Sequence, residues 1–112
     1  MTPEDILEAG IENLEKYGHI KGHYGITGEG FCAHGAMRWA ASGQAGVYLN
    51  NLRDADGANA YDQAVRRLDA LIRKEIPGIP AMNDAIVHFN DAPETTTEDV
   101  KLMMKRAITH DS

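Results

Sequence analysis

The sequence is poor in cysteine and in basic residues, and each scarcity excludes a class of protein. One cysteine in 112 residues excludes a disulfide within the chain, which is typical of proteins from a reducing compartment. Lysine and arginine number 11 against 17 acidic residues, which gives a formal charge of −6. Binding to nucleic acid or to an anionic membrane needs a concentrated basic surface, so we expect neither as a partner.

Long apolar runs are also missing. No stretch approaches the roughly 20 apolar residues that cross a bilayer. Residues 1–5 have neither the basic region nor the apolar core of a secretory leader. The composition is otherwise ordinary, with 43% apolar and 25% charged residues, and the length suits one domain with its own core. We therefore expect a single helical domain over residues 1–112, soluble and located in the cytoplasm.

Apolar residues that recur every three or four positions predict a bundle of about five helices. The first helix covers residues 2–17, with Thr2 as its N-cap and Gly18 at its end. The longest covers residues 60–76, with Asn59 as its N-cap. Between them, residues 45–52 hold a brief apolar cluster of one or two turns, and residues 53–59 form a polar connection.

Two shorter helices follow near the C-terminus. Pro80 begins a helix with Met82, Ile86 and Phe89 facing inward, and Asn90–Pro93 ends it. The closing helix begins among Thr95, Thr96 and Thr97. Thr95 and Glu98 have the spacing of a capping box, while Thr96 and Thr97 are competing caps. This helix buries Val100, Met103, Met104, Ala107 and Ile108.

The segment from Tyr24 to Ser42 is the most suggestive chemically. Alternating residues predict a short β-hairpin near residues 19–31, which turns around Gly25–Gly30. Small residues at helical spacing then predict a helix over residues 32–42. A thiol at the first turn of a helix lies beside unpaired N–H groups and the positive end of the dipole. That position lowers a cysteine pKa and attracts anions.

Cys32 is thus a candidate catalytic nucleophile. A thiol nucleophile needs a base and a group that orients the base. His34 lies about 200° around a helix from Cys32, so His88 is the better base, followed by Asn90 or Asp91. The competing interpretation is that Cys32 is a small buried core residue and that Asn90 and Asp91 merely end a helix.

Ligand sites receive less support. His19, His23, Cys32 and His34 are residue types that suit zinc, but their spacing matches no zinc signature. The glycines before Cys32 suit an anion, yet the lysine of a phosphate-binding loop is missing and Glu29 would repel the anion. We therefore expect no metal and no cofactor.

Two motifs carry a family resemblance. The chain resembles small proteins of unknown function that actinobacteria and their phages encode. The matching residues are Phe31, Cys32, Ala33, Gly35 and Ala36 in the first motif, and Phe89, Asn90, Asp91 and Pro93 in the second. The family usually has tryptophan at the position of Phe89, and His34 and His88 are not typical of it. The resemblance implies a shared fold, and leaves Cys32, Asn90 and Asp91 as the shared polar set.

The sequence leads to two hypotheses about function. The first is an accessory protein that acts by binding a host protein or another copy of itself. It follows from the small size, the incomplete catalytic set and the absence of a basic surface. The second is a cysteine-dependent hydrolase or transferase that uses Cys32 with His88 and Asn90 or Asp91. Asn90 and Asp91 have a place in either, because they are also expected to bond the first amides of the Cys32 helix.

Overall fold

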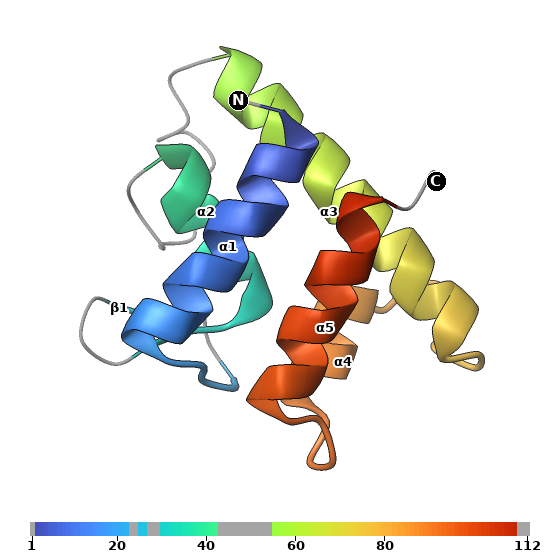
Figure 1. Cartoon of the computed structure of the whole chain (residues 1–112). Helices are drawn as coiled ribbons and strands as arrows, with labels where there is room; N and C mark the ends of the chain where they lie inside the picture. Colours follow the sequence, from blue (N-terminus) through green and yellow to red (C-terminus); the bar gives the residue numbers. More distant parts are fainter. Residues whose placement is uncertain (1, 23–24, 27–29, 43–54, 110–112) are drawn as a thin grey trace.

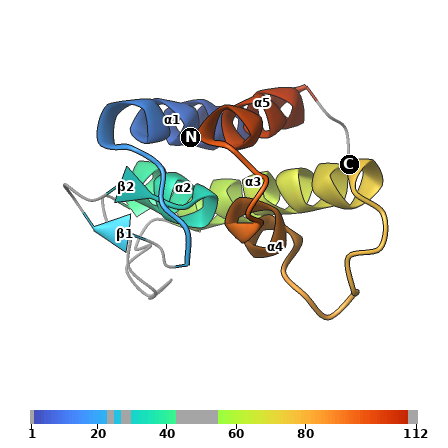
Figure 2. The same ribbon diagram turned by 90° about the horizontal axis from the view of Figure 1, so that it is seen from below.

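A computed structural model of the protein describes residues 2–22, 25–26, 30–42 and 55–109. Over these ranges the chain forms five helices and a small hairpin, so the predicted mainly α bundle is confirmed. Helices α1 and α5 form one layer, and α2, α3 and α4 lie in a second layer beneath them (Figure 1, Figure 2). The elements are α1 (Pro3–Tyr17), β1 (Gly25–Ile26), β2 (Gly30–Phe31), α2 (Ala33–Ser42), α3 (Ala55–Glu75), α4 (Ala85–Asp91) and α5 (Thr97–Ile108).

Helix α1 begins and ends as its sequence predicts. The Thr2 hydroxyl accepts a hydrogen bond from the Asp5 amide (3.1 Å), and the Asp5 carboxylate accepts one from the Thr2 amide (2.9 Å). At the other end Gly18 has φ +96° and donates its N–H to the Leu14 carbonyl (3.0 Å). These two caps satisfy backbone groups that a helix leaves unpaired.

The predicted hairpin is present as a short antiparallel pair. Gly25 lies opposite Phe31, and Ile26 lies opposite Gly30. The Phe31 strand also pairs with the segment after α1, because the Phe31 amide donates to the Gly18 carbonyl (2.9 Å). Gly30 has φ +103°, and a Cβ there would lie 2.8 Å from the Gly18 oxygen. Only glycine fits this close approach of two backbones.

Helix α3 is longer than its apolar stripe predicts. It begins at Ala55, five residues before the predicted start at residue 60, so Asn59 lies inside the helix and is not its N-cap. The prediction of a polar connection is therefore wrong for residues 55–59. Alanine has a high helix propensity, so a helix can extend beyond the turns that bury apolar residues. The apolar cluster predicted at residues 45–52 lies outside the described residues.

The segment before α4 also differs from its prediction. The helix begins at Ala85, and Asp84 is its N-cap, accepting from the Val87 amide (3.1 Å). Pro80 instead begins a turn, and Met82 is 93% exposed, so its predicted inward position is wrong. Helix α3 holds this turn in place, because the Arg73 guanidinium donates hydrogen bonds to the Pro80 and Asn83 carbonyls.

The closing helix selects one of three possible caps. Thr96 is the N-cap of α5, accepting from the Asp99 amide (3.1 Å) while the Asp99 carboxylate accepts from the Thr96 amide (2.9 Å). Thr95 is buried, and its amide donates to the Ala92 carbonyl, so it belongs to the preceding turn. The capping box is therefore formed by Thr96 and Asp99, one residue later than the predicted pair of Thr95 and Glu98.

The core lies between the two layers and receives side chains from all five helices. At its centre Gly10 of α1 leaves room for Met37 of α2 and Met104 of α5, both fully buried. The buried face predicted for α5 is confirmed, although Ile108 is only partly buried. The largest fully buried apolar side chains are Phe31, Ile6, Leu7, Leu14, Met37, Leu68, Ile72, Ile86, Met104 and Val100.

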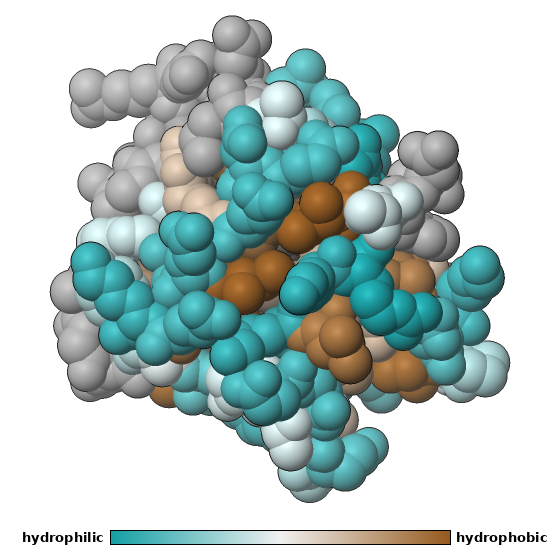
Figure 3. All heavy atoms as spheres, viewed as in Figure 1, coloured by the Kyte–Doolittle hydropathy of each residue, from teal (hydrophilic) through white to brown (hydrophobic). Residues whose placement is uncertain are grey.

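The outer face of the α1–α5 pair is mainly hydrophilic, with apolar residues exposed in places (Figure 3). Ile11, Leu102 and Ile108 line a shallow groove between these helices. Lys101 binds Glu15 of α1 (3.4 Å) and Glu98 of its own helix (2.9 Å) beside that groove. The pair with Glu15 joins α1 to α5 at the surface. Among the described helices, none has both the length and the apolar character that a membrane crossing requires.

Candidate functional site

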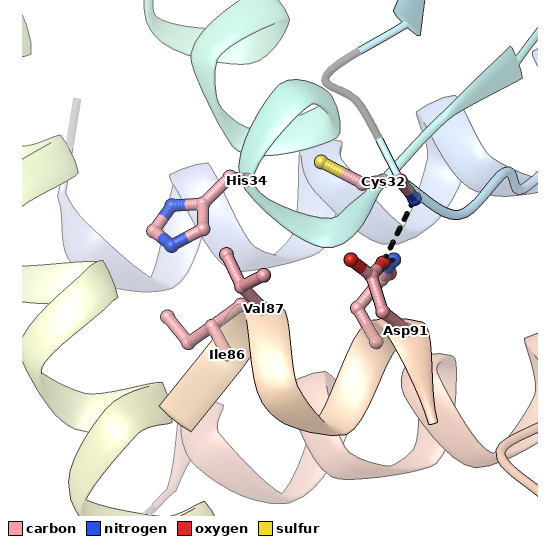
Figure 4. A pocket seen from close by; sticks show the side chains of 7 residues that line it. Cys32, His34, Ile86, Val87 and Asp91 are labelled. Carbon is pink, nitrogen blue, oxygen red and sulfur yellow. Dashed lines mark hydrogen bonds between the residues drawn. The ribbon is translucent and has the colours of Figure 1, made fainter. Parts of the chain in front are cut away.

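A pocket of about 180 Å³ lies where the start of α2 faces α4. Cys32 and His34 contribute from the α2 side, and α4 contributes an apolar wall and two polar residues at its end (Figure 4). Gly22, from the segment after α1, completes the lining. Three sequence-distant segments therefore meet here, and the full lining set is Gly22, Cys32, His34, Ile86, Val87, Asn90 and Asp91.

Cys32 directly precedes α2 and caps it. Its sulfur accepts a hydrogen bond from the Gly35 amide (3.3 Å), and its carbonyl accepts one from the Ala36 amide (2.9 Å). The residue is only 7% exposed. Burial raises the pKa of the Cys32 thiol, and the nearby charge of Asp91 raises it further, against the lowering effect of the amides. The expected lowering of this pKa at a helix start is therefore reversed by burial.

Asn90 joins the end of α4 to the start of α2. Its Oδ1 accepts from the Ala33 amide (3.0 Å) and from the His19 Nε2–H (2.7 Å). Its Nδ2 donates to the Ile20 carbonyl (3.2 Å) and to Asp91 Oδ1 (2.8 Å). Because these partners are fixed as donors and acceptors, the orientation of the amide and the tautomer of His19 follow from them. All four bonding positions of the Asn90 side chain are thus occupied.

Asp91 bonds the segment after α1, not the first amides of α2 as expected. Its Oδ1 accepts from the Gly22 amide (3.0 Å) rather than from an amide of α2. Beside it, the Lys21 ammonium donates to the Ala92 carbonyl. The end of α4 is thereby bound to both the start of α2 and the chain that follows α1. The structure therefore brings Cys32, Asn90 and Asp91 together.

His88 is not part of this group. It is exposed on α4 and lines an open groove on the outer side of the helix, whereas the pocket beside Cys32 does not include it. The helix accounts for this placement, because Ile86, Val87, Asn90 and Asp91 form the face of α4 toward the pocket and His88 lies outside that face. The base expected for Cys32 consequently lies outside the pocket.

His34 is in the pocket wall, but its ring bonds elsewhere. Its Nε2 donates to Asp84 Oδ2 (2.9 Å), and its Nδ1 is paired with the Tyr61 hydroxyl (3.2 Å). Arg38 Nε donates to the same hydroxyl (3.0 Å). The bond from His34 lowers the pKa of Asp84 to about 2. In Figure 4 the imidazole points away from the Cys32 sulfur.

This chain of polar groups was not found from the sequence. Asp84 could have been recognised as a helix cap, since it precedes an apolar helical pattern. Its partner could not, because His34 is 50 residues away in the chain.

The histidines considered for zinc do not converge. The two nitrogens of His19 are paired with Asn90 and Thr97, and those of His34 with Asp84 and Tyr61. Within the described residues, no group of three or more potential ligands could hold a metal ion. His23 lies outside the described residues.

Comparison with known proteins supplies a family but no activity. No curated protein and no solved structure matches the chain significantly. One family model does match, and it covers nearly the whole chain. On that basis, over residues 1–110, the chain belongs to DUF6197, a family of unknown function.

Proposed function

We propose that the protein acts by binding another protein, and that the pocket between α2 and α4 receives part of that partner. The proposal rests on the hydrogen bonding, burial and pKa of Cys32. Its sulfur is bonded as a helix cap, it is almost fully buried, and its pKa is raised. A thiol with a raised pKa stays protonated at neutral pH and is a weak nucleophile. A pocket without an activated nucleophile suits binding better than catalysis.

The alternative is a cysteine-dependent hydrolase or transferase. It is favoured by the position of Cys32 in the pocket wall. It also requires a base near the sulfur, and His88 is exposed outside the pocket. Asn90, one of the two expected orienting groups, has all its bonding positions in use. The geometry therefore gives this alternative less support.

The resemblance to small proteins of actinobacteria and their phages bears on the partner. For a phage-encoded chain, the partner we propose is a protein of the host cell. The acidic net charge of −6 fits a partner with a basic surface.

The rate of alkylation of Cys32 by iodoacetamide, measured against pH, tests the proposal. We expect slow reaction in the folded protein, with a midpoint above the free-thiol value of about 8.5, and fast reaction after unfolding in urea. The chain has no other cysteine, so all labelling reports on this one. Fast alkylation of the folded protein with a midpoint well below 8 would overturn the binding proposal and favour the hydrolase.

A further inference from the structure

The pocket has the size of a single side chain. Its volume is about 180 Å³, and an apolar cavity of about 150 Å³ can hold benzene. Ile86 and Val87 supply an apolar wall with His34 beside it, while Asn90 and Asp91 lie at the end of α4. The space therefore suits a group with an apolar stem and a polar tip.

The start of α2 is a poor binding site for a tip that is an anion. The Ala33 amide is bonded to Asn90, and the Gly35 amide is bonded to the Cys32 sulfur. Helix N-termini bind anions through such amides, so two of the donors are already used. The carboxylate of Asp91 lines the same pocket and repels negative charge. An anionic tip is thus disfavoured.

Asp91 has one oxygen available for a cation. Both of its hydrogen bonds, from Gly22 and Asn90, reach Oδ1. Over the described part of the chain, Oδ2 accepts no hydrogen bond and Asp91 forms no ion pair. Lys21, a nearby cation, donates instead to the Ala92 carbonyl. The charge of Asp91 is therefore only partly balanced by its own surroundings.

The rim of the pocket strengthens this negative character. An open groove shares Val87 and Asp91 with the pocket and is also lined by Asp84 and Glu94. His88 lies on the same rim. A positive group that approaches the pocket consequently passes carboxylates on its way in.

We propose that the pocket receives a lysine side chain of the protein partner, with its ammonium on Asp91 Oδ2 and its methylenes against Ile86 and Val87. This inference rests on the binding function proposed above. Lysine suits the site better than arginine, because a guanidinium binds a carboxylate best through both oxygens. At Asp91 one oxygen is already occupied.

Titration with blocked amino acids, followed by amide NMR shifts, tests the inference. The probes are the Nα-acetyl N-methylamides of lysine, norleucine, arginine and glutamate. We expect lysine to bind about tenfold more tightly than norleucine, which has the same stem without the charge. Arginine should bind more weakly than lysine. The shifts should include the amides of Gly22 and Asp91.

Two variants sharpen the result. Asp91→Asn keeps an oxygen for Gly22 and removes the charge, so it should bring lysine binding close to that of norleucine. Glu12→Gln removes a carboxylate from the separate groove between α1 and α5, and it should change lysine binding by less than about twofold. If Asp91→Asn does not fold, added salt should weaken lysine binding to the native protein and leave norleucine unaffected.

The outcomes separate this inference from the function on which it rests. If norleucine or glutamate binds as tightly as lysine, the lysine inference is overturned while a binding pocket remains. Absence of shifts with all four probes also overturns the inference. In that case the thiol measurement still distinguishes a binding protein from a hydrolase.

Discussion

Replacing Asn90 by alanine should be among the most damaging single substitutions in the protein. The side chain is 1% exposed and makes four hydrogen bonds. At a net value of about 1 kcal/mol for each bond, Asn90→Ala should lower the free energy of unfolding by about 4 kcal/mol. Most domains have only about 5–15 kcal/mol in total. The variant should therefore fold, but with little margin.

Urea denaturation followed by circular dichroism measures this loss. With a slope of about 2 kcal/mol per molar urea, the midpoint should fall by about 2 M. Asn13→Ala is the matched control, because within the described residues its half-buried amide makes a single hydrogen bond, to the Ala36 carbonyl (2.9 Å). That variant should lose about 1 kcal/mol. If the two variants have the same midpoint, Asn90 does not hold the start of α2, and the argument for its role is refuted.

Two further predictions concern Asp84 and the glycines. The folded-state pKa of Asp84 lies below its ordinary value of 3.8, so the carboxylate stabilises the fold above about pH 4 and this contribution disappears as the pH falls toward 2. Because the side chain is half exposed, the loss should be about 1 kcal/mol, and Asp84→Asn should reduce the dependence of urea midpoints on pH in this range. Gly30→Ala should cost about 2 kcal/mol or more, since its Cβ would meet the Gly18 backbone at positive φ. Gly10→Ala should cost less, because its Cβ would meet the flexible end of Met104 (2.7 Å) and Met37 Cγ (3.2 Å) rather than backbone, and alanine favours the helix. Equal thermal midpoints for the two variants would contradict this reasoning.

The ends of several helices were predictable because their signals are local. Thr2 and Gly18 cap α1 through residues three or four positions away, and sequence spacing contains that information. The α5 cap was predicted only as one of three threonines. The choice of Thr96 depends on Thr95 being buried in the preceding turn, which spacing does not reveal.

The sequence predicted individual residues of the candidate site better than it predicted which residues bond to one another. The residue pattern predicted Cys32 at a helix start and Asn90 bonded to the amides of that helix. The structure has this bond, from the Ala33 amide to Asn90 Oδ1. His88 was predicted as the base because His34 lies far around the helix from Cys32, and that reasoning did not consider which face of α4 carries His88. The pairing of His34 with Asp84 depends on how α2 packs against α4, a tertiary contact without a local signal.

The bonds of Asn90 also bear on the order in which the chain can fold during synthesis. Its partners Ala33, Ile20 and His19 are synthesised 57, 70 and 71 residues earlier. Until residue 90 leaves the ribosome, the first helices have an uncapped amide and an unpaired histidine facing water. Contacts between such distant residues form slowly, because a long loop must close before they form. The N-terminal half is therefore expected to remain loosely packed until nearly the whole protein has been made.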